Sequence, residues 1–359
     1  MHSLPPTLDA STLPTALAPM QDVTTLPFMR LMLHYGAPDY FFTEYFRAHP
    51  QSTPERQILS ALDGIGPQHP IFAQIIGEDI SSVTRTMRAL EPYPIAGIDL
   101  NMGCPAPKIY KKNVGGGLLR DPAKVDQLLG AMRETTDGRF TVKMRIGFAD
   151  TSLFFELLDV IRSHAVELVS IHGRTVKQMY RGEVDYEMIA EAKKRLTCPV
   201  FANGNITSAE KALQVQKASG VDGIMIGRSA IRNPWIFTQI RALARGEPLF
   251  RPTLGDVRNY IDALWETFKN PDVPDHLQTN FIKKFLNFVG QGVDPEGQFL
   301  KKMRRASSRS ELFEICDYWL IENGRCDQPF ATEPYEGVIA RPNREGDEQS
   351  KNAAQSCSL

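Results

Sequence analysis

Short runs of apolar and β-branched residues alternate with longer amphipathic stretches over the first two thirds of the chain. A short apolar run bounded by turn residues is typical of a buried strand, whereas apolar positions that recur every three or four residues are typical of a helix covering a sheet. Strands are predicted at residues 15–18, 39–43, 70–75, 96–100, 140–145, 167–171, 199–202 and 223–226. Helices are predicted between them, among others at residues 79–90, 122–133, 152–164, 186–196 and 208–219.

Strands that are separated by helices pair in parallel, and right-handed crossovers place the helices outside the sheet. Eight strands are the number that closes a TIM (β/α)8 barrel. A doubly wound open sheet has the same local pattern and remains the alternative fold. We favour the α/β barrel because of the strand count and because of the polar residues at the strand ends, which are described below.

The pattern changes after Pro234, where four helices are predicted at residues 254–269, 276–288, 294–308 and 310–322 without a β-rich run between them. The expected organisation is therefore a TIM barrel followed by a small all-helical C-terminal domain. From residue 326 the chain is polar and contains several prolines and glycines, so most of this tail is expected to be disordered. The predicted parts are an N-terminal extension at 1–14, the barrel at 15–245, the helical domain at 246–325 and the tail at 326–359.

The composition is that of an ordinary soluble protein, with 42% hydrophobic and 23% charged residues in a chain of 359. A net charge of -1 gives no overall attraction to nucleic acid, so a polyanionic partner would need local basic patches. Five cysteines without a C-x-x-C pair predict neither a disulfide framework nor a metal site. No signal peptide and no apolar run long enough to cross a bilayer is found, so we expect a cytoplasmic protein without membrane contact.

Polar residues follow nearly every predicted strand. In a barrel these residues face one another around one mouth, where enzymes of this architecture keep their active sites. The residues at the strand ends, most of which are polar, are in chain order Pro19, Met20 and Gln21, then Glu44, Gln74, Asn101, Cys104, Lys143, Arg145, His172, Arg174, Asn203, Gly204, Asn205, Gly227 and Arg228.

The last two loops of the predicted barrel have the composition of a phosphate site. Barrels that bind phosphate do so with the loops after strands seven and eight, where glycines let backbone N–H groups approach the anion. Asn203-Gly204-Asn205 and Gly227-Arg228 fall in these two loops. Two ordinary tight turns are the alternative interpretation.

Lys143 lies on the fifth predicted strand and His172 at the end of the sixth, and both would flank the group attached to such a phosphate. A cation is useful beside a planar cofactor that becomes an anion, such as a reduced flavin. The alternatives are a lysine paired with a neighbouring carboxylate and a histidine that hydrogen-bonds to the backbone.

Cys104 lies just after a predicted strand and before Pro105. An ordinary thiol has a pKa of about 8.5, so it is mostly protonated at neutral pH and can donate a proton, and an apolar setting strengthens this tendency. The alternative is a small buried hydrophobic residue, which is the usual role of a free cysteine.

Taken together, six segments resemble the tRNA-dihydrouridine synthases of the bacterial type. The resemblance runs in order from about Leu17 to Phe237, and the combination is specific although each segment alone is weak. The segments are Leu17-Ala18-Pro19-Met20, Asp99-Leu100-Asn101-Met102-Gly103-Cys104-Pro105, Lys143-Met144-Arg145, Ile171-His172-Gly173-Arg174-Thr175, Ala202-Asn203-Gly204 and Met225-Ile226-Gly227-Arg228.

The resemblance implies an FMN-containing barrel that uses NADPH to reduce the 5,6 double bond of a uridine in folded tRNA. By position it implies that Pro19, Met20 and Gln74 meet the isoalloxazine ring and that Gln21 also lies at the cofactor. It implies further that Lys143 lies at the N1/O2 edge of the ring and that His172 lies beside the ring. Ribityl and phosphate would be held by Asn203, Gly204, Asn205, Gly227 and Arg228. The uracil edge would be read by Asn101, Arg145 and Tyr180, and Cys104 would be the acid. The family often has an acidic residue where this chain has Asn205.

Two segments have the local positive charge that a tRNA partner requires. Residues 100–120 contain Lys108, Lys111, Lys112 and Arg120 and no acid, and residues 276–310 contain seven lysines and arginines against Asp294 and Glu296. Solvated helix faces often have this composition. The rival functions are a flavin barrel acting on a free pyrimidine, similar to the dihydroorotate dehydrogenases, and a non-catalytic RNA-binding protein. A monomer is expected.

Overall fold

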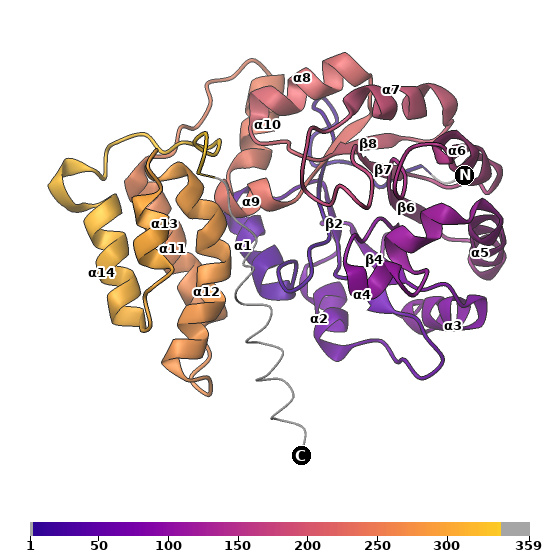
Figure 1. Ribbon diagram of the computed structural model, residues 1–359, viewed down its shortest axis with the longest axis horizontal. Coiled ribbons are helices and arrows are strands. Elements are labelled where there is room, and N and C mark those ends of the chain that lie inside the picture. The colour runs from indigo at the N-terminus through magenta and orange to yellow at the C-terminus, as the bar shows by residue number, and fades with distance from the viewer. Residues whose placement is uncertain (1–2, 339–359) are drawn as a thin grey trace. The chain divides into compact units, whose positions relative to one another are not determined.

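The first part of the chain forms a closed barrel of eight parallel strands in the computed structural model, which describes residues 3–338 (Figure 1). Each barrel strand pairs in parallel with the next, and β9 pairs with β1, which closes the ring. The predicted TIM barrel is therefore confirmed and the open sheet is excluded. The barrel strands are β1 (Thr15–Leu17), β2 (Tyr40–Phe42), β4 (Ile71–Ile76), β5 (Gly97–Met102), β6 (Phe140–Arg145), β7 (Val169–His172), β8 (Val200–Asn203) and β9 (Gly223–Ile226).

Most predicted strand bounds agree with the structure to within one or two residues, and two differences affect the description of the site. A ninth strand, β3 (Phe46–Arg47), was missed because it has only two residues, which pair with the end of β4. The strand predicted at residues 96–100 corresponds to β5, which continues to Met102 because Asn101 and Met102 pair with β6. Asn101 therefore lies inside a strand.

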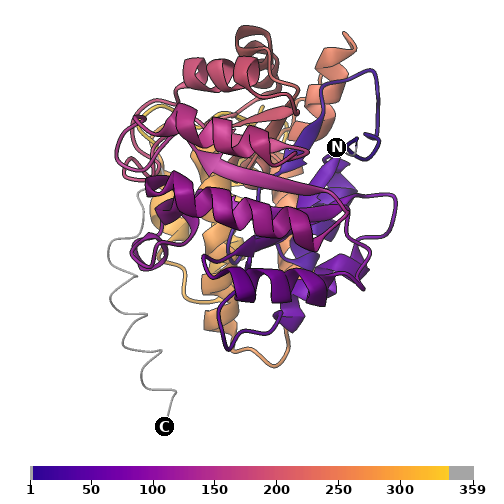
Figure 2. The same ribbon diagram turned by 90° about the vertical axis from the view of Figure 1, so that its right-hand side faces the viewer.

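Helices cover the outside of the barrel, and several begin at a capping residue that the sequence contains. The side chains of Asp79, Asp121, Asp185 and Ser208 each accept a hydrogen bond from a backbone N–H in the first turn of the following helix. In Figure 2, α3, α5 and α6 lie beside one another over the strands. The helices of this part are α1 (Leu26–Gly36), α2 (Arg56–Gly64), α3 (Ile80–Leu90), α4 (Pro107–Tyr110), α5 (Pro122–Thr135), α6 (Phe154–Ser163), α7 (Tyr186–Arg195), α8 (Ala209–Ser219), α9 (Arg228–Arg232) and α10 (Ile236–Ala244), with the 3-10 helix η1 (Gly115–Arg120).

The part of the barrel core nearest the N-terminal ends of the strands is apolar. One buried cluster gathers side chains from β1, β2, β4, β8 and β9, and it includes Tyr40, Phe72 and Phe201. The N-terminal segment packs at this end of the barrel, because Leu4 contacts the cluster and the Tyr40 hydroxyl donates to the carbonyl of Pro5 at 2.6 Å. Chemistry that needs polar groups is therefore left to the opposite, C-terminal ends of the strands.

A second compact unit begins at Arg251 and is helical, whereas the first ends at Phe250. Its core contains Tyr260, Ile282 and Leu312, which are all buried. The helices are α11 (Leu254–Phe268), α12 (Asp275–Val289), α13 (Gln298–Met303) and α14 (Arg309–Leu320), with the 3-10 helices η2 (Gly290–Gly292) and η3 (Glu322–Gly324). In the described residues no helix combines the length and apolar character that a membrane crossing requires.

One helix of this second unit was predicted with the wrong bounds, and part of the predicted tail belongs to the unit. The helix expected at 294–308 is reduced to α13, because Gly297 has a left-handed φ of 64° and the Asp294 carboxylate accepts from the N–H groups of Gln298 and Phe299. Most of the polar tail that begins at residue 326 was expected to be disordered, and for its larger part this stays a prediction. Residues 326–338 instead belong to the ordered unit, since Phe330 is buried and its N–H donates to the carbonyl of Pro252. Residues 339–359 lie outside the described part of the chain.

Candidate active site

Polar side chains occupy the C-terminal half of five neighbouring strands, from β4 to β8. The strand register places Gln74 beside Asp99, Asn101 beside Lys143, and Arg145 beside His172. His172 in turn lies beside Asn203. The structure therefore brings together the predicted residues of these strands as one continuous half-ring.

The first three strands of this half-ring are joined by a chain of short hydrogen bonds. The Asp99 carboxylate accepts from the Thr141 hydroxyl at 2.6 Å and from the Gln74 amide at 2.7 Å. Gln74 Oε1 accepts from the Asn101 amide at 2.8 Å. Asn101 Oδ1 then accepts from the backbone N–H groups of Gly103 at 3.0 Å and Cys104 at 2.9 Å.

Cys104 lies in the turn that these last bonds hold, partly buried. Burial raises the pKa of its thiol, although the positive charges of Arg145 and Lys143 oppose this change. The turn is closely packed, because the N–H of Gly116 donates to the Cys104 carbonyl and a Cβ on Gly115 would lie only 3.0 Å from the Cys104 Cβ. The thiol is thus held in place and protonated at neutral pH, as a proton donor requires.

Lys143 projects from β6 toward β8, where its ammonium group donates to Asn203 Oδ1 at 3.4 Å. Burial and the neighbouring Arg145 lower the pKa of Lys143 to about 8, and the Asp99 carboxylate acts in the opposite direction. Near pH 7 the group still carries its charge, and one long hydrogen bond to a neutral amide leaves it available to an anion.

His172 is surrounded by cations. Its pKa lies well below the usual value because the ring is buried and because Lys143, Arg145, Arg174 and Arg228 repel a further positive charge. The ring is therefore neutral at pH 7. Arg174 Nη1 lies 3.3 Å from His172 Nε2, which accepts from the guanidinium when the ring proton is on Nδ1.

Arg145 donates hydrogen bonds to two loops of the mouth. It donates through Nε to the Gly103 carbonyl at 3.0 Å and through Nη1 to the carbonyls of Thr175 at 2.9 Å and Met179 at 2.7 Å. Tyr180, the next residue of the second loop, is half exposed, and the Arg228 and Arg145 guanidinium carbons lie 4.3 and 5.5 Å from its ring centre. Arg145 and Tyr180 are therefore together at the rim, as predicted by position.

The two loops expected to hold a phosphate are also at this rim. Gly204 has a φ of 115° and Asn205 a φ of 46°, so the turn after β8 uses conformations that most residues avoid. The Tyr186 hydroxyl donates to the Gly204 carbonyl at 2.6 Å. In the last loop, a Cβ on Gly227 would lie 3.5 Å from the sulfur of Met20, which places the first and last loops side by side.

Pro19 and Met20 are partly buried at the end of β1, whereas Gln21 is exposed on the following turn. Glu44, which follows β2, is buried and accepts from the N–H of Asp22 in that turn. Burial raises the pKa of the Glu44 carboxyl. Its observed role is thus to hold the first loop.

Sequence reasoning missed the roles of Asp99, Thr141 and Arg174. Arg174 is almost fully buried, and its guanidinium also donates to the Gly182 carbonyl at 2.8 Å. Its place directly after a strand was a usable signal, since a charged residue there faces the mouth. Asp99 and Thr141 gave a weaker signal, because a polar residue inside an apolar run has no partner that a single sequence identifies.

The mouth has an excess of positive charge. Lys143, Arg145, Arg174 and Arg228 all face it, and within residues 3–338 none of the four forms an ion pair with a carboxylate. Unpaired cations in a partly buried site stabilise a bound anion. The donor set therefore fits a phosphate-bearing ligand. No group of three or more His, Cys, Asp and Glu side chains that could hold a metal ion occurs among the residues described.

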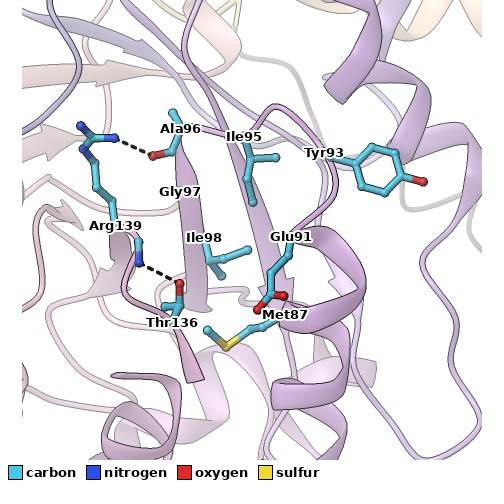
Figure 3. A pocket seen from close by; sticks show the side chains of 10 residues that line it. Met87, Glu91, Tyr93, Ile95, Ala96, Gly97, Ile98, Thr136 and Arg139 are labelled. Carbon is cyan, nitrogen blue, oxygen red and sulfur yellow. Dashed lines mark hydrogen bonds between the residues drawn. The ribbon is translucent and has the colours of Figure 1, made fainter. Parts of the chain in front are cut away.

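A separate cavity of about 240 Å³ lies at the other end of the strands (Figure 3). It is lined by the start of β5, including Gly97 and Ile98, and by Met87 of α3. Its one basic residue, Arg139, donates to the carbonyls of Ala96 and Ser3. The cavity lacks the convergent polar groups of the mouth, so we do not regard it as the active site.

Comparison with known families identifies the family of the chain. Residues 16–312 match the family model described as dihydrouridine synthase (Dus). The chain belongs to the dihydrouridine synthase family. The matched region includes the barrel strands, apart from the first residue of β1, and most of the helical unit, and all the rim residues fall within it.

The relatives of this dihydrouridine synthase include proteins named tRNA-dihydrouridine synthase B. The protein of Xanthomonas campestris pv. campestris is 35% identical over 310 residues, which cover 84% of this chain and 92% of the relative. The protein of Pasteurella multocida is 34% identical over 247 residues, covering 68% of this chain and 74% of the relative.

Among solved structures, a complex of 2-naphthoyl-CoA reductase with 2-naphthoyl-CoA is similar to this chain with a TM-score of 0.51 at 11% sequence identity. The similar region covers 65% of this chain and 50% of the reductase. At this identity the likeness concerns the fold alone.

Proposed function

We propose that this dihydrouridine synthase reduces the 5,6 double bond of specific uridines in tRNA to dihydrouridine, with FMN as the bound cofactor and NADPH as the reductant. The observation that carries the proposal is the combination, in one barrel mouth, of a thiol whose pKa is raised and four cations without acidic partners. The relatives named tRNA-dihydrouridine synthase B support tRNA as the substrate.

The residues of the mouth fit FMN by their chemistry. Asn203, Gly204, Asn205, Gly227 and Arg228 would hold the ribityl chain and phosphate, while Pro19, Met20, Gln21 and Gln74 would lie at the ring. Lys143 and His172 would complete the site, the lysine as a cation and the histidine as a neutral hydrogen-bonding group. When bound, FMN would supply the hydride that C6 of the uracil receives, and NADPH would reduce the flavin again.

The thiol of Cys104 would give its proton to C5 of the uracil. Because burial favours the protonated thiol, the group is in the required state at neutral pH. Asn101, Arg145 and Tyr180 would hold the base. The hydrogen bonds of Asn101 limit its contribution, since Oδ1 already accepts twice and only the second hydrogen of its amide is left for a substrate carbonyl.

A uridine inside folded tRNA has to leave its stack to enter the barrel mouth, which costs a few kcal/mol and is offset by stacking in the site. Exposed lysines beside Cys104 would contact the surrounding phosphates, and further exposed cations lie on the helical unit. These residues are Lys108, Lys111 and Lys112 in the loop after β5, and Lys284, Lys301, Lys302, Arg305 and Arg309 in the helical unit.

The test is to measure dihydrouridine in tRNA treated with the purified enzyme, FMN and NADPH, and to compare Cys104→Ala with Cys326→Ala. Cys326 is a partly exposed thiol of the helical unit and serves as the matched control. Cys104→Ala should bind FMN and tRNA as the wild type does but lose at least about 100-fold in turnover, the usual contribution of a general acid. Cys326→Ala should remain active. Full activity of Cys104→Ala would remove the acid assignment.

The same assay separates the rival functions. Reduction of free uridine or another free pyrimidine in preference to tRNA would indicate an enzyme similar to the dihydroorotate dehydrogenases. A purified protein that binds tRNA but no flavin, and forms no dihydrouridine, would indicate a non-catalytic RNA-binding protein.

A further inference from the structure

In the chain of hydrogen bonds that begins at Asp99, each group can donate or accept in only one arrangement. The groups at both ends of the chain fix this arrangement. An ionised carboxylate can only accept, so the nitrogen of the Gln74 amide has to face Asp99 and its oxygen has to face Asn101. At the other end the groups of Gly103 and Cys104 are backbone N–H donors, so the oxygen of Asn101 has to face them. The two requirements agree, and each amide is fixed in one orientation.

We propose that Asp99 is a positioning residue that fixes the Cys104 turn through the amides of Gln74 and Asn101. The proposal rests on the proposed function, because it concerns the thiol that would donate the proton. Asp99 lies in the strand below the turn, and its effect passes through two side chains to the backbone of residues 103 and 104. It is not expected to touch the uracil.

The alternative is that Asp99 only stabilises the barrel, and its burial makes this a serious alternative. Asp99 is completely buried, as is Gln74, and the bond from Thr141 ties β6 to β5. A purely structural role predicts that removal of Asp99 lowers stability without a specific effect at Cys104. A positioning role predicts a change in the reactivity of the thiol and in the chemical step.

Two substitutions at Asp99 separate these roles. Asp99→Leu removes both acceptor oxygens at similar volume and releases the Gln74 amide. Asp99→Asn keeps the direction of the chain, because its oxygen can accept from Gln74 while its nitrogen donates to the Thr141 hydroxyl, which can also accept. Asn is therefore the rescuing variant.

Two controls account for lost stability. Thr141→Val removes the hydrogen bond that the Thr141 hydroxyl donates to the Asp99 carboxylate, but it leaves the bonds from Asp99 toward Cys104 intact. Asp39→Leu removes another completely buried carboxylate of the barrel, which accepts from Thr15 and from the N–H of Leu8 at the opposite end of the strands. If Asp99→Leu is insoluble, Gln74→Met interrupts the chain one step closer to the cysteine and takes its place in the alkylation readout alone, because Gln74 is itself proposed to lie at the flavin ring.

The first readout does not depend on activity. The rate of alkylation of Cys104 by iodoacetamide is measured on each folded variant by peptide mass spectrometry, relative to Cys326 in the same molecule. We expect Asp99→Leu to change the relative rate at Cys104 at least threefold, and Asp99→Asn, Thr141→Val and Asp39→Leu to leave it unchanged. Equal rates in Asp99→Leu and the wild type would overturn the proposal, and so would an equal change in Asp39→Leu.

The second readout is the reduction of tRNA by the FMN-loaded enzyme. Asp99→Leu should lower kcat by about 10- to 100-fold, the usual effect of misplacing a reacting group by about 1 Å, while KM for tRNA and FMN content stay within a factor of three. Wild-type kcat in Asp99→Leu would contradict the proposal. An inactive wild type would instead contradict the proposed function, and the alkylation experiment would still decide whether Asp99 positions the turn.

Discussion

Asp99 illustrates how much a single buried charge affects this barrel. Burial raises its pKa to about 6, although hydrogen bonds from Gln74 and Thr141 and the charge of Lys143 act in the opposite direction. An ionised carboxylate in the barrel core is thus unfavourable for folding at neutral pH. A residue that lowers stability in its working state is typical of functional sites, where stability is given up for the arrangement of groups that the chemistry needs.

The stability of cofactor-free protein should therefore respond to pH in a defined way when Asp99 is replaced. The carboxyl group binds its proton more tightly in the folded state, with a pKa of about 6, than in the unfolded state, with a pKa of 3.8. Between these values wild-type stability falls as the pH rises, whereas Asp99→Asn does not titrate. We expect the difference in unfolding free energy, variant minus wild type, to increase by up to about 3 kcal/mol from pH 4 to pH 7.

Urea unfolding of both proteins at several pH values measures this difference. Lys143 has a pKa of about 8 in the wild type, and loss of the Asp99 charge lowers it, so the measurements from pH 4 to pH 6 decide the comparison. A difference that stays constant with pH, or decreases as the pH rises, would show that the Asp99 carboxyl is not destabilised by burial.

At the scale of elements, the loops after the strands determine where the site residues lie. The turn after β8 is the clearest case, because Gly204 has a positive φ and a Cβ added to it would lie 2.9 Å from the His172 ring. Only glycine lets this turn pass so close to the histidine. The conformation of this turn and the position of His172 on β7 therefore depend on each other.

Gly204→Ala should consequently disturb both the turn and the ring of His172. Gly220 gives a matched control, since it also has a positive φ, at the end of α8, but an added Cβ there meets nothing within 4 Å. Gly220→Ala should cost about 1 kcal/mol of stability and keep the wild-type flavin content. We expect Gly204→Ala to reduce the bound FMN at least tenfold, as measured by absorbance after gel filtration. Equal flavin content in the two variants would refute this role of the turn.

The elements could be predicted where their pattern is strong. All eight barrel strands were found because apolar runs at regular spacing mark them, but the two-residue β3 left no such signal. The end of β5 was misplaced because Asn101 interrupts the apolar run, and only its bonds to Gln74 and to the turn explain a polar residue inside a strand. In the helical unit, the shortened α13 depends on the conformation of Gly297, which the apolar pattern does not contain.

The same limit applies to the site. The positions of Cys104, Lys143 and His172 at strand ends were predictable, because the ends of parallel strands meet at one mouth. The partners of Gln74 and the loop contacts of Arg145 were not, since these bonds join residues 25 to 42 positions apart. A single sequence shows which residues can make such bonds but not which pairs meet.

At the scale of the whole molecule, the chain combines a net charge of -1 with locally basic surfaces. In the helical unit, Lys283 and Arg304 are committed to its own fold, the first to the Ala306 carbonyl and the second to the Asn287 side chain. Asp294 is likewise used internally by the N–H groups of Gln298 and Phe299. Five exposed cations of residues 276–310 then remain against one exposed acid, Glu296, so the exposed charge of this segment is clearly positive.

Binding of tRNA should accordingly weaken with salt, and this dependence should come from particular residues. Each phosphate contact that a lysine makes releases counterions, so the slope of log K against log salt measures the number of contacts. The double variant Lys301→Gln/Lys302→Gln on α13 should reduce this slope by about 1 to 2 and weaken binding to all tRNAs alike.

Lys194→Gln/Lys217→Gln removes the same charge from exposed positions on the outer barrel helices α7 and α8, and should leave the slope unchanged. Filter binding between about 50 and 200 mM salt measures the slopes of both double variants. Over this range, about a factor of four, several phosphate contacts change the affinity strongly. Equal slopes for the two double variants would mean that net charge, and not the α13 surface, governs the encounter with RNA.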